Sequence, residues 1–393
     1  MLLRKVYMDY GAGMHLDPRV LETMKPYFFE TFGNPSSSHS FGNKAKEALA
    51  ASREKVAQLV AAEKPREIIF TSGGTESNNL ALKGAAFRNQ KKGNHIITTA
   101  IEHMSVINIC KYLQKEGYDV TFVPVNKQGV VEIEKLKEAI TEKTILISVM
   151  YANGEIGTIQ PIQEIGNLAK ENNLLFHVDA VAAAGKVPIN VKEKNIDLLS
   201  LSSNDMYGPR GVGALYIKQG TKILPVIQGG GQENGIRSGT ENIPGIVGMG
   251  KAAELAQTEM KSVGKRLTAL RDKLIKGVLS KIAYSFLNGH PTQRLPGNAN
   301  LRFSYIEGES LILGLDMYGI QVSSGSACTS KTLEPSHVLT AIGLPHEEAH
   351  GSLVFTMGKQ NTEEDVNYIL DVLPDVVKRL RALSPLTPKE ILR

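Results

Sequence analysis

Residues 198–216 carry the densest set of groups that could do chemistry. An apolar run ends in the hydroxyls of Ser202 and Ser203, and the polar pair Asn204 and Asp205 follows before a glycine-rich turn. This order predicts a buried strand that ends in hydroxyls, then a turn into a second strand. Ligands of parallel sheets bind beyond such strand ends, so we expect ligand contacts here.

Other groups capable of chemistry follow predicted strands or open predicted helices. Gly74 and Thr75 begin a helix, where unpaired N–H groups and a hydroxyl could bind a phosphate, although Thr75 could also be a simple helix cap. Asp179 ends a buried strand and needs a cationic or N–H partner, because an unpaired buried carboxylate is costly; backbone amides could be that partner. His103 could be a ligand contact or a satisfied structural histidine, and Asn153 follows another predicted strand.

The two cysteines lie in contrasting surroundings. Cys110 has apolar neighbours at helical spacing, which predicts a core position. Cys328 lies in residues 323–331, whose small polar residues and glycine predict an exposed loop and a working thiol, and Lys331 would favour the thiolate. The wide separation of the two cysteines does not suggest a metal knuckle, and a disulfide is not expected in a reducing compartment.

The elements that must position these groups follow from the alternation of apolar strands with amphipathic helices. This alternation predicts an α/β fold with a mainly parallel sheet covered on both faces. A long helix at about 247–278 bridges to a smaller α+β part. We predict a large domain over residues 15–255 and a small domain made of residues 1–14 and 256–393. The expected strands are Ile68–Thr71, 96–99, 120–122, 145–149, 174–178 and 198–201.

Composition limits the class of protein. Hydrophobic residues make up 42% and charged residues 22%, as in ordinary soluble globular proteins, and no apolar run approaches the length of a membrane span. The net charge of +5 is modest and scattered, which disfavours nucleic-acid binding. The N-terminus becomes polar too early for a signal peptide, so we expect a cytoplasmic protein.

From Met8 to Pro385 the chain closely resembles the NifS/IscS-type cysteine desulfurases, pyridoxal-phosphate enzymes of the class-V aminotransferase family. The resemblance implies a fold-type-I homodimer with a seven-stranded sheet that acts in iron–sulfur cluster assembly. It implies that Asp179 pairs with the pyridine nitrogen, that His103 stacks on the ring, and that Thr240 reaches the phosphate from the neighbouring subunit. The expected cofactor contacts are Gly74, Thr75, His103, Asn153, Asp179, Ser202, Asn204 and Thr240.

Five functional positions depart from that family's pattern. Asp205 stands in place of the lysine that forms an imine with the cofactor, and Asn204 replaces the preceding histidine. Gly154 and Ala182 replace an asparagine and a glutamine that contact the ring hydroxyl. Val354 replaces the arginine that binds the substrate carboxylate and cannot make that charge-assisted contact. Together these losses indicate that ordinary desulfurase turnover is no longer the purpose of the site.

Two functions remain open on this evidence. In the one we favour, Cys328 carries persulfide sulfur or ligates a [2Fe–2S] cluster jointly with an IscU-type scaffold protein, and the chain does little cysteine chemistry itself. In the other, non-covalently bound pyridoxal phosphate converts L-cysteine to L-alanine and a Cys328 persulfide, with another base in place of the missing lysine. New chemistry around Asp205 is a minor third hypothesis.

Overall fold

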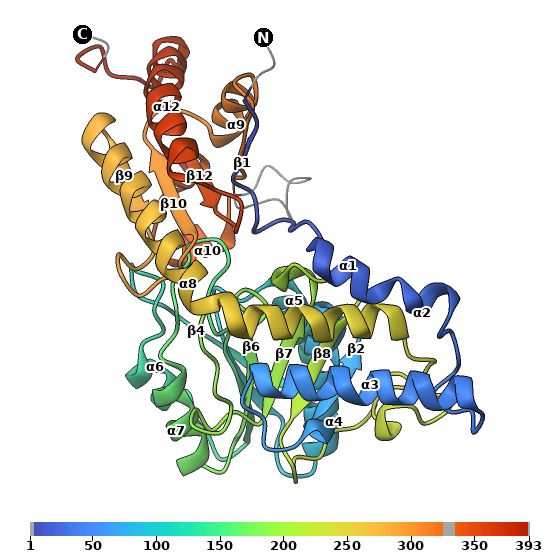
Figure 1. Cartoon of the computed structure of the whole chain (residues 1–393). Helices are drawn as coiled ribbons and strands as arrows, with labels where there is room; N and C mark the ends of the chain where they lie inside the picture. The colour runs from blue at the N-terminus through green and yellow to red at the C-terminus, as the bar shows by residue number, and fades with distance from the viewer. Residues whose placement is uncertain (1–3, 325–334, 392–393) are drawn as a thin grey trace.

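The computed structural model of the chain describes residues 4–324 and 335–391 (Figure 1). Its largest sheet has seven strands, and all of its neighbouring pairs are parallel except those made by β8. The predicted mainly parallel seven-stranded sheet is therefore confirmed. In spatial order the strands are β2 (Ile68–Thr71), β8 (Gly213–Ile217), β7 (Leu198–Ser202), β6 (Leu175–Asp179), β5 (Thr144–Ser148), β3 (His95–Thr99) and β4 (Asp119–Val123).

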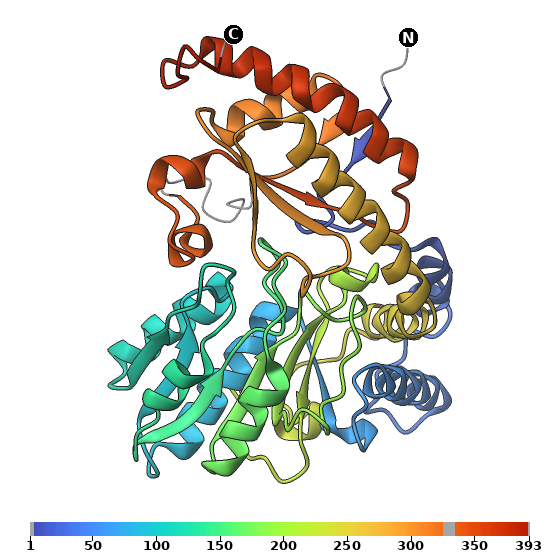
Figure 2. The same ribbon diagram turned by 90° about the vertical axis from the view of Figure 1, so that its left-hand side faces the viewer.

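Seven helices precede the middle of the chain: α1 (Pro18–Met24), α2 (Pro26–Phe29), α3 (Ser40–Leu59), α4 (Gly74–Asn89), α5 (Met104–Lys115), α6 (Ile133–Glu138) and α7 (Ile162–Glu171). Helices cover both faces of the sheet (Figure 2). Successive strand side chains point to opposite faces, so Ile69 packs in one apolar cluster with residues of α4 and α5, whereas Ile68 packs in another with residues of α3 and α7. This two-sided burial explains why the strands are continuous apolar runs.

The longest helix, α8 (Ile243–Lys281), contributes to two separate cores. Its residues up to Ala256 join the core under the large sheet, and its residues from Leu267 onward join a second core. Val6 and Met8 belong to that second core, far from the rest of it in sequence. Figure 1 shows α8 running from one lobe of the molecule into the other.

The second core is enclosed by two small sheets and the C-terminal helix. Strand order is β12–β10–β9 in the antiparallel sheet, and β1 pairs with β11 in parallel. The elements are β1 (Val6–Tyr7), β9 (Ser285–Asn288), β10 (Asn298–Phe303), α9 (Gly308–Asp316), β11 (Ile320–Gln321), β12 (Ser352–Thr356) and α12 (Glu363–Leu383). Two short helices, α10 (His337–Ala341) and α11 (His346–His350), lie between β11 and β12 in the sequence.

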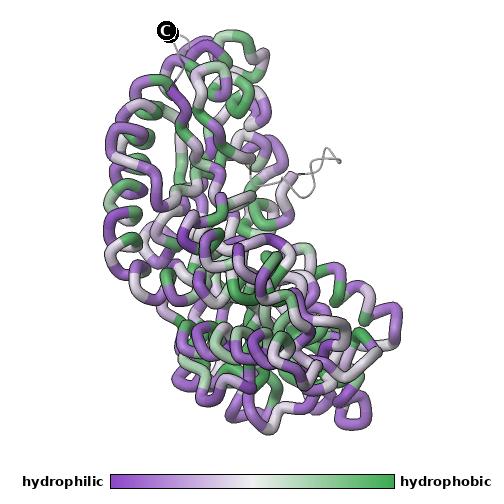
Figure 3. The backbone as a smooth tube through the Cα atoms, turned by 45° about the vertical axis from the view of Figure 1, so that its right-hand side comes forward, coloured by the Kyte–Doolittle hydropathy of each residue, from purple (hydrophilic) through white to green (hydrophobic). Residues whose placement is uncertain are grey.

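The predicted division at residues 255 and 256 falls inside α8. Buried residues of α10 and α11, such as Leu339 and Ala349, pack in the core of the large sheet although they lie late in the sequence. Hydrophobic and hydrophilic residues are interspersed along the chain in both lobes (Figure 3). Among the described residues, no helix combines the length and apolar character needed to cross a membrane.

Candidate active site

The end of β7 leads directly into a short chain of hydrogen bonds. Ser202, the last residue of the strand, donates its hydroxyl to Oδ1 of Asn204 at 2.7 Å, and Nδ2 of Asn204 donates to Oδ2 of Asp205 at 2.9 Å. Residues Asn204–Met206 form a 3-10 turn, which holds these three side chains on one side of the strand end. The carboxylate of Asp205 is thus fixed by its neighbours and only 15% exposed.

A lysine that sequence analysis did not single out lies beside this carboxylate. Nζ of Lys186 is 4.0 Å from Oδ1 of Asp205 and donates to the carbonyl oxygen of Ala182 at 3.0 Å. Burial lowers the pKa of Lys186, an effect that the charge of Asp205 opposes. Burial likewise raises the pKa of Asp205, although Lys186 opposes that change. Desolvation therefore outweighs the attraction between the two groups.

The N-terminus of α4 has no side-chain cap. Its cap residue is Gly73, whose φ of 152° favours glycine, and no side chain in residues 4–324 and 335–391 accepts from the first-turn N–H groups there. Thr75 is exposed, and the simple capping role considered for it is absent among the described residues. A Cβ on Gly74 would lie 2.6 Å from Cγ2 of Val181, so glycine is needed for this close approach. These uncapped N–H groups and the Thr75 hydroxyl fit a phosphate.

Asp179, at the end of β6, is held by two donors. Nδ2 of Asn78 in α4 donates to Oδ2 at 2.8 Å, and the backbone N–H of Val181 donates to Oδ1 at 3.0 Å. The expected need for an N–H partner is met by one backbone amide and one side-chain amide. Asn78 was missed from the sequence; its only signal is a polar residue one helical turn after Gly74. This arrangement leaves a fixed, 5% exposed carboxylate beside the helix N-terminus.

His103 is connected to the same group of residues. Nδ2 of Asn78 also lies 2.8 Å from Oγ of Ser105, and Oγ of Ser105 lies 2.7 Å from Nδ1 of His103. The backbone N–H of Ser105 donates to Nδ1 of His103 at 3.1 Å, which makes His103 the N-cap of α5. Because Nδ1 accepts, a neutral ring carries its proton on Nε2. The ring itself is exposed and can stack on a ligand.

Asn153 uses its side chain to build the turn after β5. Nδ2 donates to the carbonyl oxygen of Ile101 at 2.9 Å, and Oδ1 accepts from the N–H groups of Glu155 and Ile156, both at 2.9 Å. The amide is therefore fully engaged within the protein. Oε2 of Glu155 in turn accepts from Ser336, the N-cap of α10, at 2.8 Å.

The remaining predicted residues are not brought to this group within the described chain. Thr240 is exposed, and Nε of Arg237, three residues earlier, donates to Glu76 in the first turn of α4 at 2.9 Å. No hydrogen bond between the described residues joins Thr240 to Ser202. Cys328 lies outside the described residues. Cys110 is buried in α5, as predicted, and burial raises the pKa of its thiol to about 12.

One cavity is bordered by three of the five positions at which the sequence analysis expects a departure from the family pattern. Gly154, Ala182 and Asp205 border a space of about 90 Å³, together with Lys186. Val354 is not part of this lining; it is buried in β12 and its N–H donates to the carbonyl of Ser323 at 2.7 Å. Gly154 has no side chain and the side chain of Ala182 ends at Cβ, so neither fills the space next to Asp205.

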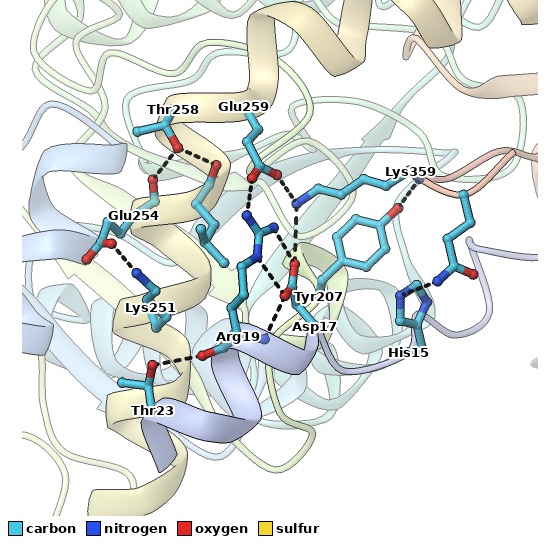
Figure 4. A network of polar contacts seen from close by, with 12 residues as sticks. His15, Asp17, Arg19, Thr23, Tyr207, Lys251, Glu254, Thr258, Glu259 and Lys359 are labelled. Carbon is cyan, nitrogen blue, oxygen red and sulfur yellow. Dashed lines mark hydrogen bonds and ion pairs between the residues drawn. The ribbon is translucent and has the colours of Figure 1, made fainter. Parts of the chain in front are cut away.

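A network of ion pairs adjoins the cavity, which Tyr207, Glu259 and Lys359 border (Figure 4). Arg19 contacts Oδ2 of Asp17 at 2.7 Å and Oε1 of Glu259 at 2.6 Å, and Oε2 of Glu259 contacts Nζ of Lys359 at 2.6 Å. The hydrogen bond from Arg19 lowers the pKa of Asp17 to about 2. The backbone N–H of Lys359 donates to the hydroxyl of Tyr207 at 2.7 Å, which joins the network to the turn that carries Asp205.

The chain is similar in sequence to a known protein family and to named members of it. Residues 6–369 match the model of the aminotransferase class-V family. The chain is 56% identical to cysteine desulfurase IscS 1 of Archaeoglobus fulgidus over 97% of this chain and 99% of the relative. It is also 56% identical to cysteine desulfurase IscS of Methanosarcina thermophila over 98% of this chain and 95% of the relative.

Solved structures give the same result for the fold. A structure described as a NifS-like protein superposes with a TM-score of 0.90 at 40% identity, covering 96% of this chain and all of that one. A structure described as SspA in complex with cysteine superposes with a TM-score of 0.79 at 37% identity over 90% of this chain and 99% of that one.

Proposed function

This chain belongs to the class-V aminotransferase family and, within it, to the NifS/IscS group of cysteine desulfurases, and from this premise we propose that it serves iron–sulfur cluster assembly mainly as a sulfur-carrying or cluster-ligating partner. The expected fold-type-I architecture is confirmed by the NifS-like structure that it matches. The proposal assigns the working thiol to Cys328 and expects a homodimer that docks an IscU-type scaffold protein.

The observation that carries this proposal is the identity and fixation of residue 205. The carboxylate of Asp205, bonded to Asn204 at 2.9 Å, occupies the sequence position of the group's imine-forming lysine. A carboxylate has no amine, so residue 205 cannot form the covalent link to a cofactor aldehyde. Gly154, Ala182 and Val354 also lack the side chains to which the family resemblance assigns contacts with the ring hydroxyl and the substrate carboxylate.

The residues at the N-terminus of α4 and at the ends of β6 and β7, which do not themselves border the cavity, nevertheless fit pyridoxal phosphate. When bound, this cofactor supplies an aldehyde and an electron-withdrawing ring. We propose that Thr75 and the uncapped N–H groups of α4 bind its phosphate, that Ser202 turns its hydroxyl from Asn204 to join them, and that Thr240 of a second subunit completes the cradle. Asp179, positioned by Asn78, would hold the ring nitrogen, and His103 would cover a face of the ring. The cofactor would be retained by this cradle rather than by a bond to residue 205.

The cluster-ligating role follows from counting ligands. A [2Fe–2S] cluster takes four protein ligands, most often thiolates. The chain has two cysteines, and Cys110 is buried in an apolar cluster with α5. An all-cysteine cluster therefore needs thiolates from another protein, and Cys328 is the residue that we propose contributes one. The second candidate function, a desulfurase with non-covalent cofactor, is favoured by the intact Asp179 and α4 end of the pocket.

Anaerobic cluster reconstitution with an IscU-type scaffold tests this proposal. The complex should develop the visible absorption of a [2Fe–2S] cluster, and Cys328→Ser should weaken or abolish its retention because serine lacks the soft thiolate. Cys110→Ser serves as the matched control and should retain the cluster. Unchanged cluster content with Cys328→Ser would show that the thiol is not a ligand, and would favour sulfur transfer instead.

A further inference from the structure

We propose that Lys186 is the carbonyl-reactive amine of this site, and that it condenses with the aldehyde of a ligand bound beside Asp205. The position is not the one at which the family carries its imine-forming lysine. The inference rests on the proposed function in one respect only, namely that a pyridoxal-type ligand bound at Asp179 and the N-terminus of α4 reaches with its aldehyde into the cavity beside Asp205.

Geometry places this amine in the right space. Lys186 and Asp205 border the same cavity, and the Lys186 Nζ lies 4.0 Å from Oδ1 of Asp205. Its single described hydrogen bond is to the carbonyl oxygen of Ala182, which also borders the cavity. Its side chain is 25% exposed and borders the cavity.

The other lysine that borders the cavity provides a contrast. Nζ of Lys359 contacts Oε2 of Glu259 at 2.6 Å and Oδ2 of Asp17 at 3.9 Å, within the network of Figure 4. The Lys359 nitrogen is therefore engaged by two carboxylates. Lys186 has one carboxylate nearby, that of Asp205, at 4.0 Å. Burial lowers the pKa of Lys186 and raises the pKa of Asp205, so it favours the uncharged amine and the uncharged carboxyl. The charged side chains that border the cavity within the described chain are Lys186, Asp205, Glu259 and Lys359.

An uncharged amine is the form that attacks a carbonyl carbon. In the step we infer, the Lys186 nitrogen forms a bond to the aldehyde carbon, and the carbon–oxygen bond then breaks. Both amine hydrogens leave with that oxygen as one molecule of water, and a carbon–nitrogen double bond remains. No oxidant or reductant is required. The carboxyl of Asp205, whose pKa burial raises, is placed to pass a proton to the departing oxygen and to take one back from the nitrogen, so that it is unchanged at the end of the step.

Borohydride trapping tests the inference without any measure of turnover. The full-length protein is incubated separately with pyridoxal phosphate and with pyridoxal, reduced, digested and analysed by peptide mass spectrometry. We expect Lys186 to carry more label than Lys359, because Nζ of Lys359 is engaged by Oε2 of Glu259 at 2.6 Å whereas Nζ of Lys186 lies 4.0 Å from Oδ1 of Asp205. Label spread over other lysines with Lys186 unmodified overturns the inference.

Two variants separate chemistry from folding. Lys186→Arg keeps a positive charge and a donor for the Ala182 carbonyl but cannot be trapped as a reduced pyridoxyl-lysine, so it should lose the label and keep its thermal unfolding temperature. Lys186→Met should also lose it. If either variant keeps the same amount of label, the amine is elsewhere and the inference fails.

The two ligands also distinguish this inference from the proposed function. If Lys186 is labelled equally well by pyridoxal and by pyridoxal phosphate, the amine is confirmed and the phosphate cradle is refuted. If pyridoxal phosphate binds in equilibrium dialysis but Lys186 is never labelled, the cradle stands and the inference is refuted.

Discussion

A β-carbon added to Gly154 would lie 3.6 Å from Cβ of Ala182, so these two positions face each other at ordinary contact distance in the cavity wall. Larger side chains at both positions would share the space next to Asp205. Restoring the family's residue at one position therefore cannot restore the environment of the others.

The first prediction concerns restoration of desulfurase turnover. Asp205→Lys alone should release sulfide from L-cysteine at least about a hundredfold more slowly than the variant that also carries Gly154→Asn, Ala182→Gln and Val354→Arg, because groups that align a substrate act together. Sulfide assays under matched conditions measure this, with thermal unfolding as the check that buried Val354 tolerates arginine. Equal rates would show that residue 205 alone limits turnover.

The second prediction concerns the phosphate cradle. Thr75→Val removes a hydroxyl that is exposed and does not cap α4. Affinity for pyridoxal phosphate in equilibrium dialysis should fall by about tenfold, the effect of one hydrogen bond to a charged group. Affinity for pyridoxal, which lacks the phosphate, should not change. A similar loss for both ligands would place Thr75 against the ring rather than the phosphate.

The sequence was sufficient for the sheet and for the residues at its strand ends. Local patterns identify Asp179 because a carboxylate after an apolar strand needs a partner, and they identify Cys110 because its neighbours repeat at helical spacing. The partner itself, Asn78, comes from a helix 101 residues away in sequence, so no local pattern reveals it. A polar residue at a strand end can be identified from its neighbours in sequence, whereas the residue that hydrogen-bonds to it depends on how the elements pack.

Lys186 shows the same limit more sharply. Its sequence signal is a lone lysine in a mostly apolar stretch seven residues after Asp179, which also describes an ordinary surface lysine. Only the folded turn after β6 brings its nitrogen to Asp205. Asn153 illustrates the opposite case: its position predicts ligand contact, and the structure gives every polar atom of its side chain a partner within the protein.

The third prediction concerns Glu102, which is fully buried under the site. Oε1 accepts from the Thr99 hydroxyl and from the Met150 N–H, whereas Oε2 has no partner among the described residues. Burial raises the pKa of Glu102 to about 8. The native state therefore keeps the proton after the unfolded state has lost it, and Glu102 should destabilise the protein progressively as pH rises from about 4.5 toward 8.

Glu102→Gln keeps both hydrogen bonds and removes this titration. Relative to the variant, the natural protein should lose about 2 kcal/mol of unfolding free energy between pH 5 and pH 7. Urea unfolding of both proteins at the two pH values measures the difference. Parallel pH profiles would mean that Glu102 is ionised in the native state.

The fourth prediction concerns Asp17, whose pKa is lowered to about 2 by the hydrogen bond from Arg19. A lowered pKa stabilises the native state above the unfolded value near 4, and this stabilisation is lost as pH falls through 2. Asp17→Asn should lower the thermal unfolding temperature at pH 7, by a modest amount because Arg19 is half exposed, and the difference should vanish toward pH 2.

A matched control for Asp17 exists in the next helical turn. Glu22 and Lys25 form an ion pair in which both side chains are more than half exposed. Glu22→Gln should leave the unfolding temperature unchanged at pH 7. Equal losses for Asp17→Asn and Glu22→Gln would indicate a general charge effect instead of the Arg19 contact.

Because α8 is shared by the two lobes, we expect the lobes to unfold together. Ala256 is packed in one core and Leu267 in the other, on the same continuous helix. Cleavage near residue 256, or expression of the two parts as separate chains, would divide α8. Each fragment would keep only one part of the helix and of its apolar face. Such fragments should aggregate or remain unfolded when expressed apart, and the intact chain should melt in one transition.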